Sequence, residues 1–203
     1  MKKYAVLHEP GDIVTLAGTR FVVLDVERRG SLPDSLFLLA LESVGASEFG
    51  SSNNYAESDL KKAVDKWLED MGKSGLDNAK LIPREIDLTT LDGSGCYGKL
   101  SVKAAPLTLD EAREYADIIP NAERWCWLAT GWSGPSKSDG DYALYVLSNG
   151  DWLNYYCSNS LGIRPALKIP SDLLLDSADK PDLSEVPTDT LLEEIRRRVV
   201  DKA

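Results

Sequence analysis

The sequence predicts a single α+β domain with two helices and a small, mainly antiparallel sheet, followed by a linker and a C-terminal helix. Two segments repeat apolar residues every three or four positions behind a capping residue, which is typical of amphipathic helices. Several short runs rich in β-branched and aromatic residues flank turn signals, which is typical of antiparallel strands. A chain of 203 residues with 43% hydrophobic residues is long enough to bury a core. We expect the domain to span residues 1–170, the acidic linker 171–187 and the terminal helix 188–203.

The first predicted element is a β-hairpin between Gly11 and Val26. The segment GDIVTLAGTRFVVLDV carries β-branched and aromatic residues on both sides of Ala17-Gly18-Thr19. That turn signal predicts two antiparallel strands. The run SLFLLALE, Ser35 to Glu42, follows. Its length suits a buried strand and its Leu and Ala content suits a helix, so both interpretations stay open.

Two helices are predicted after this run. Ser58 caps the first helix and Gly72 marks its end. Its inner stripe comprises Leu60, Val64, Trp67, Leu68 and Met71. Thr108 and Glu111 have the spacing of a capping box, which predicts the start of the second helix. Its inner stripe comprises Leu109, Ala112, Tyr115 and Ala116.

The stretch between the helices, 87–100, contains three glycines. It lacks the residue order of a phosphate-binding loop, so we interpret it as a long surface loop.

Aromatic residues concentrate after Asn121, where short strands are expected to alternate with turns. The expected strands are RWCWLAT, DYALYVL and DWLNYYC, and Asn149-Gly150 between the last two is a strong hairpin signal. GIRPALKI is expected to be the last strand, and Pro165 favours a sheet edge or a bulge because it lacks a backbone donor.

Alternation within DWLNYYC divides its side chains between two faces. We expect Trp152, Asn154 and Tyr156 to be exposed together. Leu153 and Cys157 are expected to point inward.

The C-terminal segment is separate from the domain in this interpretation. Residues 171–187 combine acidic side chains with two prolines, which is typical of a linker. Thr190 and Glu193 form a second capping box, and the terminal helix carries an apolar stripe. Packing on its own domain, self-association and attachment to a larger assembly are open alternatives, because an isolated helix of this length is marginal in water.

Charge and cysteine content limit the class of protein. The net charge of −10 disfavours nucleic acid as a partner, since the only dense basic cluster is Arg196 to Arg198. No secretory signal or membrane-spanning run is recognised. Cys96, Cys126 and Cys157 are widely spaced, which fits buried free thiols in a reducing compartment. We expect a cytoplasmic protein or a virion component without a membrane partner.

The order GDIV, FVVLDV, KAVDKWL, PLTLDEAREY, WCWLAT, YALYVLSNGDW and SLGIRPALKI resembles a bacterial and phage domain family of unknown function. The resemblance covers about residues 11–169 and is strongest at Gly162 to Leu167. It implies a C-type-lectin-like fold, related to the formylglycine-generating group and to the variable proteins of diversity-generating retroelements. The segments 65–69 and 127–130 lack the arginines that the family has there, so their packing is expected to differ.

Catalysis is not expected. The formylglycine-generating type needs two close cysteines, whereas only Cys157 lies near the end of the domain. Iron-dependent relatives need several histidines, and His8 is the only one in the chain. We therefore predict no catalytic residue, no metal and no cofactor. Calcium is a weaker alternative, with oxygen ligands from Asp139, Asp141, Asn149, Asp151 and Asn154. A solvated turn explains the same residues more simply.

A binding surface is the function that these residues favour. Tyr, Trp, Ser and Asn dominate antibody paratopes, and the retroelement-diversified proteins resemble this segment just before their closing strand. The predicted ligand-binding residues are Trp132, Tyr145, Asn149, Trp152, Asn154, Tyr156 and Asn159. Arg164 is expected to be a buried ion-pair partner. We predict a non-catalytic module for a protein or carbohydrate ligand. A structural subunit of a phage particle and an enzyme related to the formylglycine-generating group are the alternatives.

Overall fold

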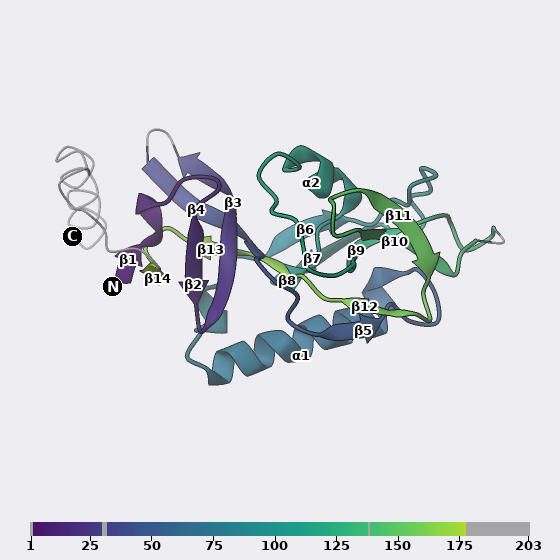
Figure 1. The fold of residues 1–203 in the computed structure, drawn as a ribbon, viewed down its shortest axis with the longest axis horizontal. Coiled ribbons are helices and arrows are strands. Elements are labelled where there is room, and N and C mark those ends of the chain that lie inside the picture. Colours follow the sequence, from purple (N-terminus) through teal and green to yellow (C-terminus); the bar gives the residue numbers. More distant parts are fainter. Residues whose placement is uncertain (1, 30–31, 138, 178–203) are drawn as a thin grey trace.

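The computed structural model describes residues 2–29, 32–137 and 139–177, and this part of the chain is an α+β structure of mainly antiparallel strands with two α-helices. The strands form a seven-stranded, a five-stranded and a two-stranded sheet. The two larger sheets occupy opposite ends of the long axis of the molecule (Figure 1).

The seven-stranded sheet contains both ends of the described chain. Its order is β1 (Lys2–Tyr4), β14 (Leu174–Ser177), β2 (Ile13–Leu16), β3 (Thr19–Arg29), β4 (Leu32–Ala40), β13 (Ala166–Pro170) and β8 (Ala104–Ala105). The predicted hairpin is confirmed as β2 and β3. Its turn residues Ala17 and Gly18 have φ angles of 48° and 82°, as expected where a tight turn matches the twist of two antiparallel strands.

The apolar run SLFLLALE is a strand rather than a helix, because the sheet is covered on both faces. Leu36 and Leu38 belong to one core cluster, whereas Phe37 and Leu39 belong to another. A strand buried on both faces is apolar at every position, so its sequence shows no alternation.

The five-stranded sheet holds the predicted aromatic strands. Its order is β11 (Trp152–Tyr156), β10 (Tyr142–Val146), β9 (Cys126–Gly131), β12 (Ser160–Gly162) and β5 (Ala46–Glu48). The segments RWCWLAT, DYALYVL and DWLNYYC are confirmed as strands.

GIRPALKI was wrongly predicted as one strand. The chain leaves β12 at Gly162 and enters β13 of the other large sheet at Ala166. Pro165 lies in this crossing, where it donates no ladder bond, and its carbonyl accepts from Ala40 N at 2.8 Å.

The loop predicted at 87–100 is shorter in the structure: residues 88–98 join β6 (Arg84–Asp87) to β7 (Lys99–Val102), and these strands form the two-stranded sheet. Three short 3₁₀ helices complete the described elements: η1 (Ala5–Leu7), η2 (Tyr55–Glu57) and η3 (Asn78–Lys80).

Helix α1 (Asp59–Lys73) begins as predicted and ends later. The Ser58 hydroxyl accepts from Lys61 N at 2.9 Å. Gly72 is not the stop. The helix closes at Gly75, which has a φ of 102°, and Leu76 N donates back to Met71 O at 3.1 Å. This is the Schellman arrangement, and only a left-handed residue completes it without strain.

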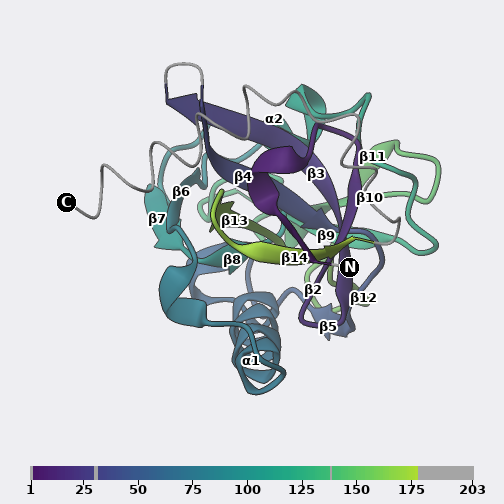
Figure 2. The ribbon, with the colours of Figure 1, turned by 90° about the vertical axis from the view of Figure 1, so that its left-hand side faces the viewer.

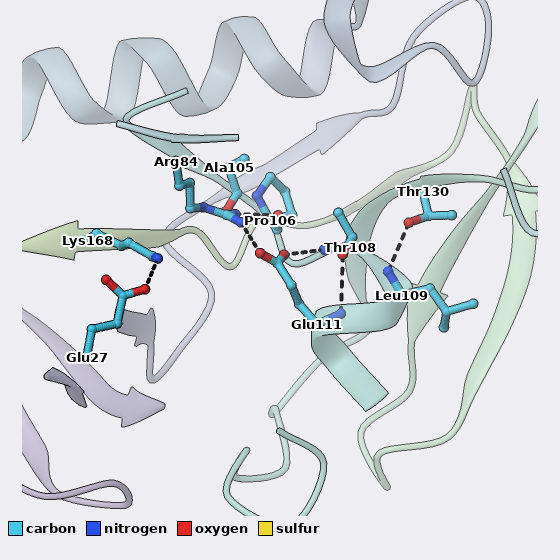
Figure 3. Close-up of polar contacts among 9 residues, drawn as sticks. All are labelled: Glu27, Arg84, Ala105, Pro106, Thr108, Leu109, Glu111, Thr130 and Lys168. Atoms are coloured by element: carbon cyan, nitrogen blue, oxygen red, sulfur yellow. Dashed lines mark hydrogen bonds and ion pairs between the residues drawn. The ribbon is translucent and has the colours of Figure 1, made fainter. Parts of the chain in front are cut away.

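Helix α2 (Leu109–Glu114) is short and is held by several polar contacts. The predicted capping box is confirmed: the Thr108 hydroxyl accepts from Glu111 N at 3.2 Å, and the Glu111 carboxylate accepts from Thr108 N at 2.8 Å. Buried Arg84 pairs with the same carboxylate (Figure 3). Ala116, expected on the inner stripe, is exposed because the helix ends before it.

The two helices lie on opposite sides of the strands (Figure 2). On the α1 side, Leu60, Val64 and Met71 join Phe21 of β3 and Trp127 of β9 in one core cluster. On the α2 side, a second cluster joins both large sheets, with Val22, Leu39, Leu109, Leu128 and Leu144 among its members.

The segment expected to be a linker begins inside the domain. Strand β14 pairs with β1 and β2, and Leu175 is fully buried. The domain therefore extends past residue 170. Residues 178–187 and the predicted terminal helix, 188–203, lie outside the described residues. Among the helices that are described, none has the length and apolar character needed to cross a membrane.

Candidate functional site

Exposed aromatic side chains gather at one edge of the five-stranded sheet. Among the described residues, the large hydrophobic side chains that are exposed are Trp125, Trp152, Leu153, Tyr155 and Tyr156. Four of them form most of β11, which is the outermost strand of the sheet. Trp125 directly precedes β9.

The hydrogen bonds to β10 determine which backbone groups of β11 face outward. Leu147 N donates to Asp151 O and Cys157 N donates to Asp141 O, both at 2.7 Å. Along an antiparallel strand, alternate residues direct both of their backbone groups to the same neighbour. Residues 151, 153, 155 and 157 therefore bond to β10. The backbone N–H and C=O of Trp152, Asn154 and Tyr156 point away from the sheet.

Within the described part of the chain, this open edge is covered only at its Tyr156 end. The Tyr156 carbonyl accepts from Asn159 N at 2.9 Å and from Asn159 Nδ2 at 3.2 Å. The outward backbone N–H and C=O groups of Trp152 and Asn154 lie on the same edge, away from the Asn159 side chain.

The side chains of β11 divide between two faces. On the α2 face, the ring centroids of Tyr156 and Tyr142 lie 4.2 Å apart. The Arg113 Cζ atom lies 5.0 Å from the centroid of the Trp152 ring. On the opposite face, the rings of Tyr155 and Trp125 both pack near the ring of Tyr145. The centroid distances to Tyr145 are 5.9 Å for Tyr155 and 5.4 Å for Trp125. Both faces therefore present aromatic surface beside the open edge.

The alternation predicted for this strand is partly confirmed. Trp152 and Tyr156 are exposed at 37% and 48%, and Asn154 is half-buried. Leu153 was wrongly expected to point inward, since it is 52% exposed. Leu153 lies opposite Tyr145 in the strand pair. Tyr145 is buried and Leu153 is exposed, so the boundary of the core lies between these two side chains. Cys157 is buried as expected.

The other predicted binding residues have different positions. Tyr145 is only 4% exposed and supports the surface from below. Trp132 is half-buried against the second core cluster. Asn149 lies exposed in the β10–β11 turn, where its Nδ2 donates to the Asp151 carboxylate at 2.7 Å. Asn159 caps the end of β11 through the bonds to Tyr156 described above.

The oxygen ligands considered for calcium are not brought together. Asp141 and Asp151 lie at opposite ends of the β10–β11 hairpin, roughly 20 Å apart at ~3.3 Å per residue. Within the described residues, no three His, Cys, Asp or Glu side chains cluster as a metal site.

The cysteines are free, and two of the three are buried. Burial raises the pKa of the Cys126 thiol to about 11 and that of Cys157 to about 12, so both are protonated at neutral pH. Cys96 is exposed, contrary to expectation.

A cavity of about 400 Å³ opens beside the hairpin, on the α2 side. Trp152, Arg113 and Arg164 are among its lining residues. Arg164 is buried, as predicted, but its partners are carbonyls rather than a carboxylate. Its Nε donates to Ala40 O at 2.7 Å and its Nη1 to Pro120 O at 3.0 Å. The sequence offered no signal for this cavity, because its walls come from distant segments.

No protein family model, curated protein or solved structure matches this chain.

Proposed function

We propose that this chain is a non-catalytic binding module of C-type-lectin-like fold, and that it binds a protein partner by adding an extended segment of that partner to β11. The fold assignment is supported by the two helices among antiparallel sheets and by the resemblance at Gly162 to Leu167. A likeness of fold does not define a function, so the function rests on β11 itself.

The observation that carries the proposal is a sheet edge that no other described segment covers at Trp152 and Asn154, with aromatic side chains on both faces. Proteins usually protect such edges with charged residues, proline or a bulge, because an open edge pairs with other chains. The strand WLNYY contains neither charged residues nor proline, and its pairing with β10 is regular. Strand addition would supply partners for the outward backbone groups, while the aromatic side chains would supply contact area and specificity.

A protein partner accounts for more of these features than a carbohydrate. A sugar would stack on an aromatic ring, but it would leave the outward backbone groups of Trp152 and Asn154 without a continuous ladder. An extended peptide uses both the backbone and the rings.

The test is selection of random peptides displayed on a surface, followed by calorimetric measurement of their affinity. The Asn154→Pro variant removes one outward N–H and places a ring at the edge, so we expect its affinity for selected peptides to fall at least tenfold, or about 1.4 kcal/mol. Glu48→Pro is the matched control, because β5 is the other edge of the same sheet. It should bind like the wild type.

Equal binding by Asn154→Pro and the wild type would contradict the proposal. Failure to select any peptide that requires Asn154 would do the same.

A further inference from the structure

The cavity beside α2 has the size and lining of a small-molecule site. It lies between α2 with its following segment, β9 and the β10–β11 turn. Its apolar walls include Leu107, Ile119, Leu128, Val146 and Trp152. A volume of about 400 Å³ falls in the range of pockets that hold small organic ligands.

A positive charge without a carboxylate partner lines this cavity. Arg164 is 6% exposed and forms no ion pair with any described residue. Its Nη2 is buried and has no hydrogen-bond acceptor in the described part of the chain. Leaving a buried charged donor without an acceptor is more costly than leaving a neutral donor unpaired, so an acceptor that enters the cavity would recover that energy.

Cys126 and Glu42 act electrostatically on Arg164, but neither forms an ion pair with it. Glu42 is exposed and pairs with Arg20. Cys126 lines the same cavity, and burial raises the pKa of its thiol to about 11. The thiol is therefore uncharged at neutral pH.

The mouth of the cavity adds a second cation and an aromatic ring. Arg113 lies over Trp152, and its only described ion pair is a long contact of 3.6 Å with exposed Asp110. The single carboxylate of the lining, Asp151, accepts a hydrogen bond from Asn149. Two guanidinium groups and one carboxylate thus give the cavity a net positive lining in a chain of net charge −10.

We infer that this cavity binds a small organic carboxylate, with its charged group toward Arg164 and a flat apolar body between the apolar walls and Trp152. This site goes beyond the proposed strand addition, because it uses the interior of the α2 side rather than the edge of β11. The buried charge selects an anion over a neutral analogue, and the apolar walls select a ligand with a hydrophobic body.

The test compares phenylacetate with phenylacetamide, which has nearly the same shape without the charge. Isothermal titration calorimetry of the full chain should show binding of phenylacetate and at least tenfold weaker binding of the amide. Equal affinity for the two, or no binding of phenylacetate at about 10 mM, would overturn the inference.

A variant that fills the cavity tests the location. Ala116 lines the cavity and is exposed, so Ala116→Phe should occupy it without unfolding the chain. We expect phenylacetate affinity to fall at least tenfold. Ala79→Phe, at an exposed position on η3, is the control and should bind like the wild type. Wild-type affinity in Ala116→Phe would overturn the assignment.

The two proposals fail separately. Asn154→Pro should keep phenylacetate binding, because Asn154 does not line the cavity. Ala116→Phe should keep the binding of peptides selected at β11.

Discussion

At the scale of single residues, two buried arginines show how partners decide a role. Arg84 pairs with Glu111 and also donates to the carbonyls of Ala105 and Pro106 at 3.0 and 3.1 Å (Figure 3). Arg164 is equally buried but contacts only carbonyls. The burial of Arg164 was predicted from the sequence, although the segment that holds it crosses between two sheets instead of forming one strand. The sequence does not show which carboxylates lie near Arg164 in the fold, because the residues around it come from distant segments.

Arg84→Ala should be strongly destabilising. The change leaves Glu111 without its cationic partner and two carbonyls without their donor, and breaking a buried ion pair typically costs about 3–5 kcal/mol. We expect urea unfolding to show a loss of this size. Lys99→Ala, which removes an exposed ion pair with Glu85, should change the free energy of unfolding little. Equal effects of the two substitutions would contradict the structural role of Arg84.

Glu27 should make stability depend on pH. Burial acts to raise the pKa of this carboxyl, but hydrogen bonds from Lys168 and Ser35 outweigh it and hold the pKa below its ordinary value of 4.5. A lowered folded-state pKa stabilises the protein above the unfolded pKa, and this contribution is lost as the pH falls through the folded pKa. Glu27→Gln should therefore be less stable than the wild type at pH 6, and the difference should shrink as the pH falls below the ordinary pKa of 4.5. A constant difference across thermal melts in this range would contradict the assignment.

At the scale of elements, the side-chain alternation of β11 can be predicted from the sequence, but its place at the edge of the sheet cannot. Asn149-Gly150 predicts the hairpin, and alternation predicts the shared face of Trp152 and Tyr156. The exposure of Leu153 could not be predicted, because it depends on β11 being the outermost strand. A strand with a neighbour on both sides would have buried the same leucine.

Two proline substitutions test the direction of the β11 backbone. Asn154→Pro removes an N–H that points away from β10, so we expect the melting temperature to stay close to that of the wild type. Tyr155→Pro removes an N–H that points to β10 and leaves a carbonyl unsatisfied, so the free energy of unfolding should fall by about 2 kcal/mol or more. Thermal denaturation monitored by circular dichroism distinguishes the two variants. A lower stability of Asn154→Pro than of Tyr155→Pro would contradict the pairing of β11 with β10.

At the scale of the whole molecule, the two core clusters bind the large sheets into one unit. Each cluster contains residues of both sheets, with Phe21 and Trp127 together on the α1 side and Leu39 and Leu144 together on the α2 side. The α+β class was predictable from periodicity and turn signals. The division into two sheets was not, because the chain changes sheets within GIRPALKI, whose local sequence resembles one continuous strand.

Unfolding should therefore be a single transition. Four of the five tryptophans lie in or near the five-stranded sheet, whereas circular dichroism reports on all elements. We expect tryptophan fluorescence and circular dichroism to give the same midpoint in urea, as in a two-state transition. Separate midpoints would show that the sheets unfold independently.

Hydrogen exchange of the β11 amides tests strand addition most directly. In the free protein, the amides of Leu153 and Tyr155 should be protected by β10, while those of Trp152 and Asn154 exchange quickly. When a selected peptide is bound, the amides of Trp152 and Asn154 should become protected and those of Leu153 and Tyr155 should change little. A bound peptide that leaves the amides of Trp152 and Asn154 in fast exchange would contradict strand addition at this edge.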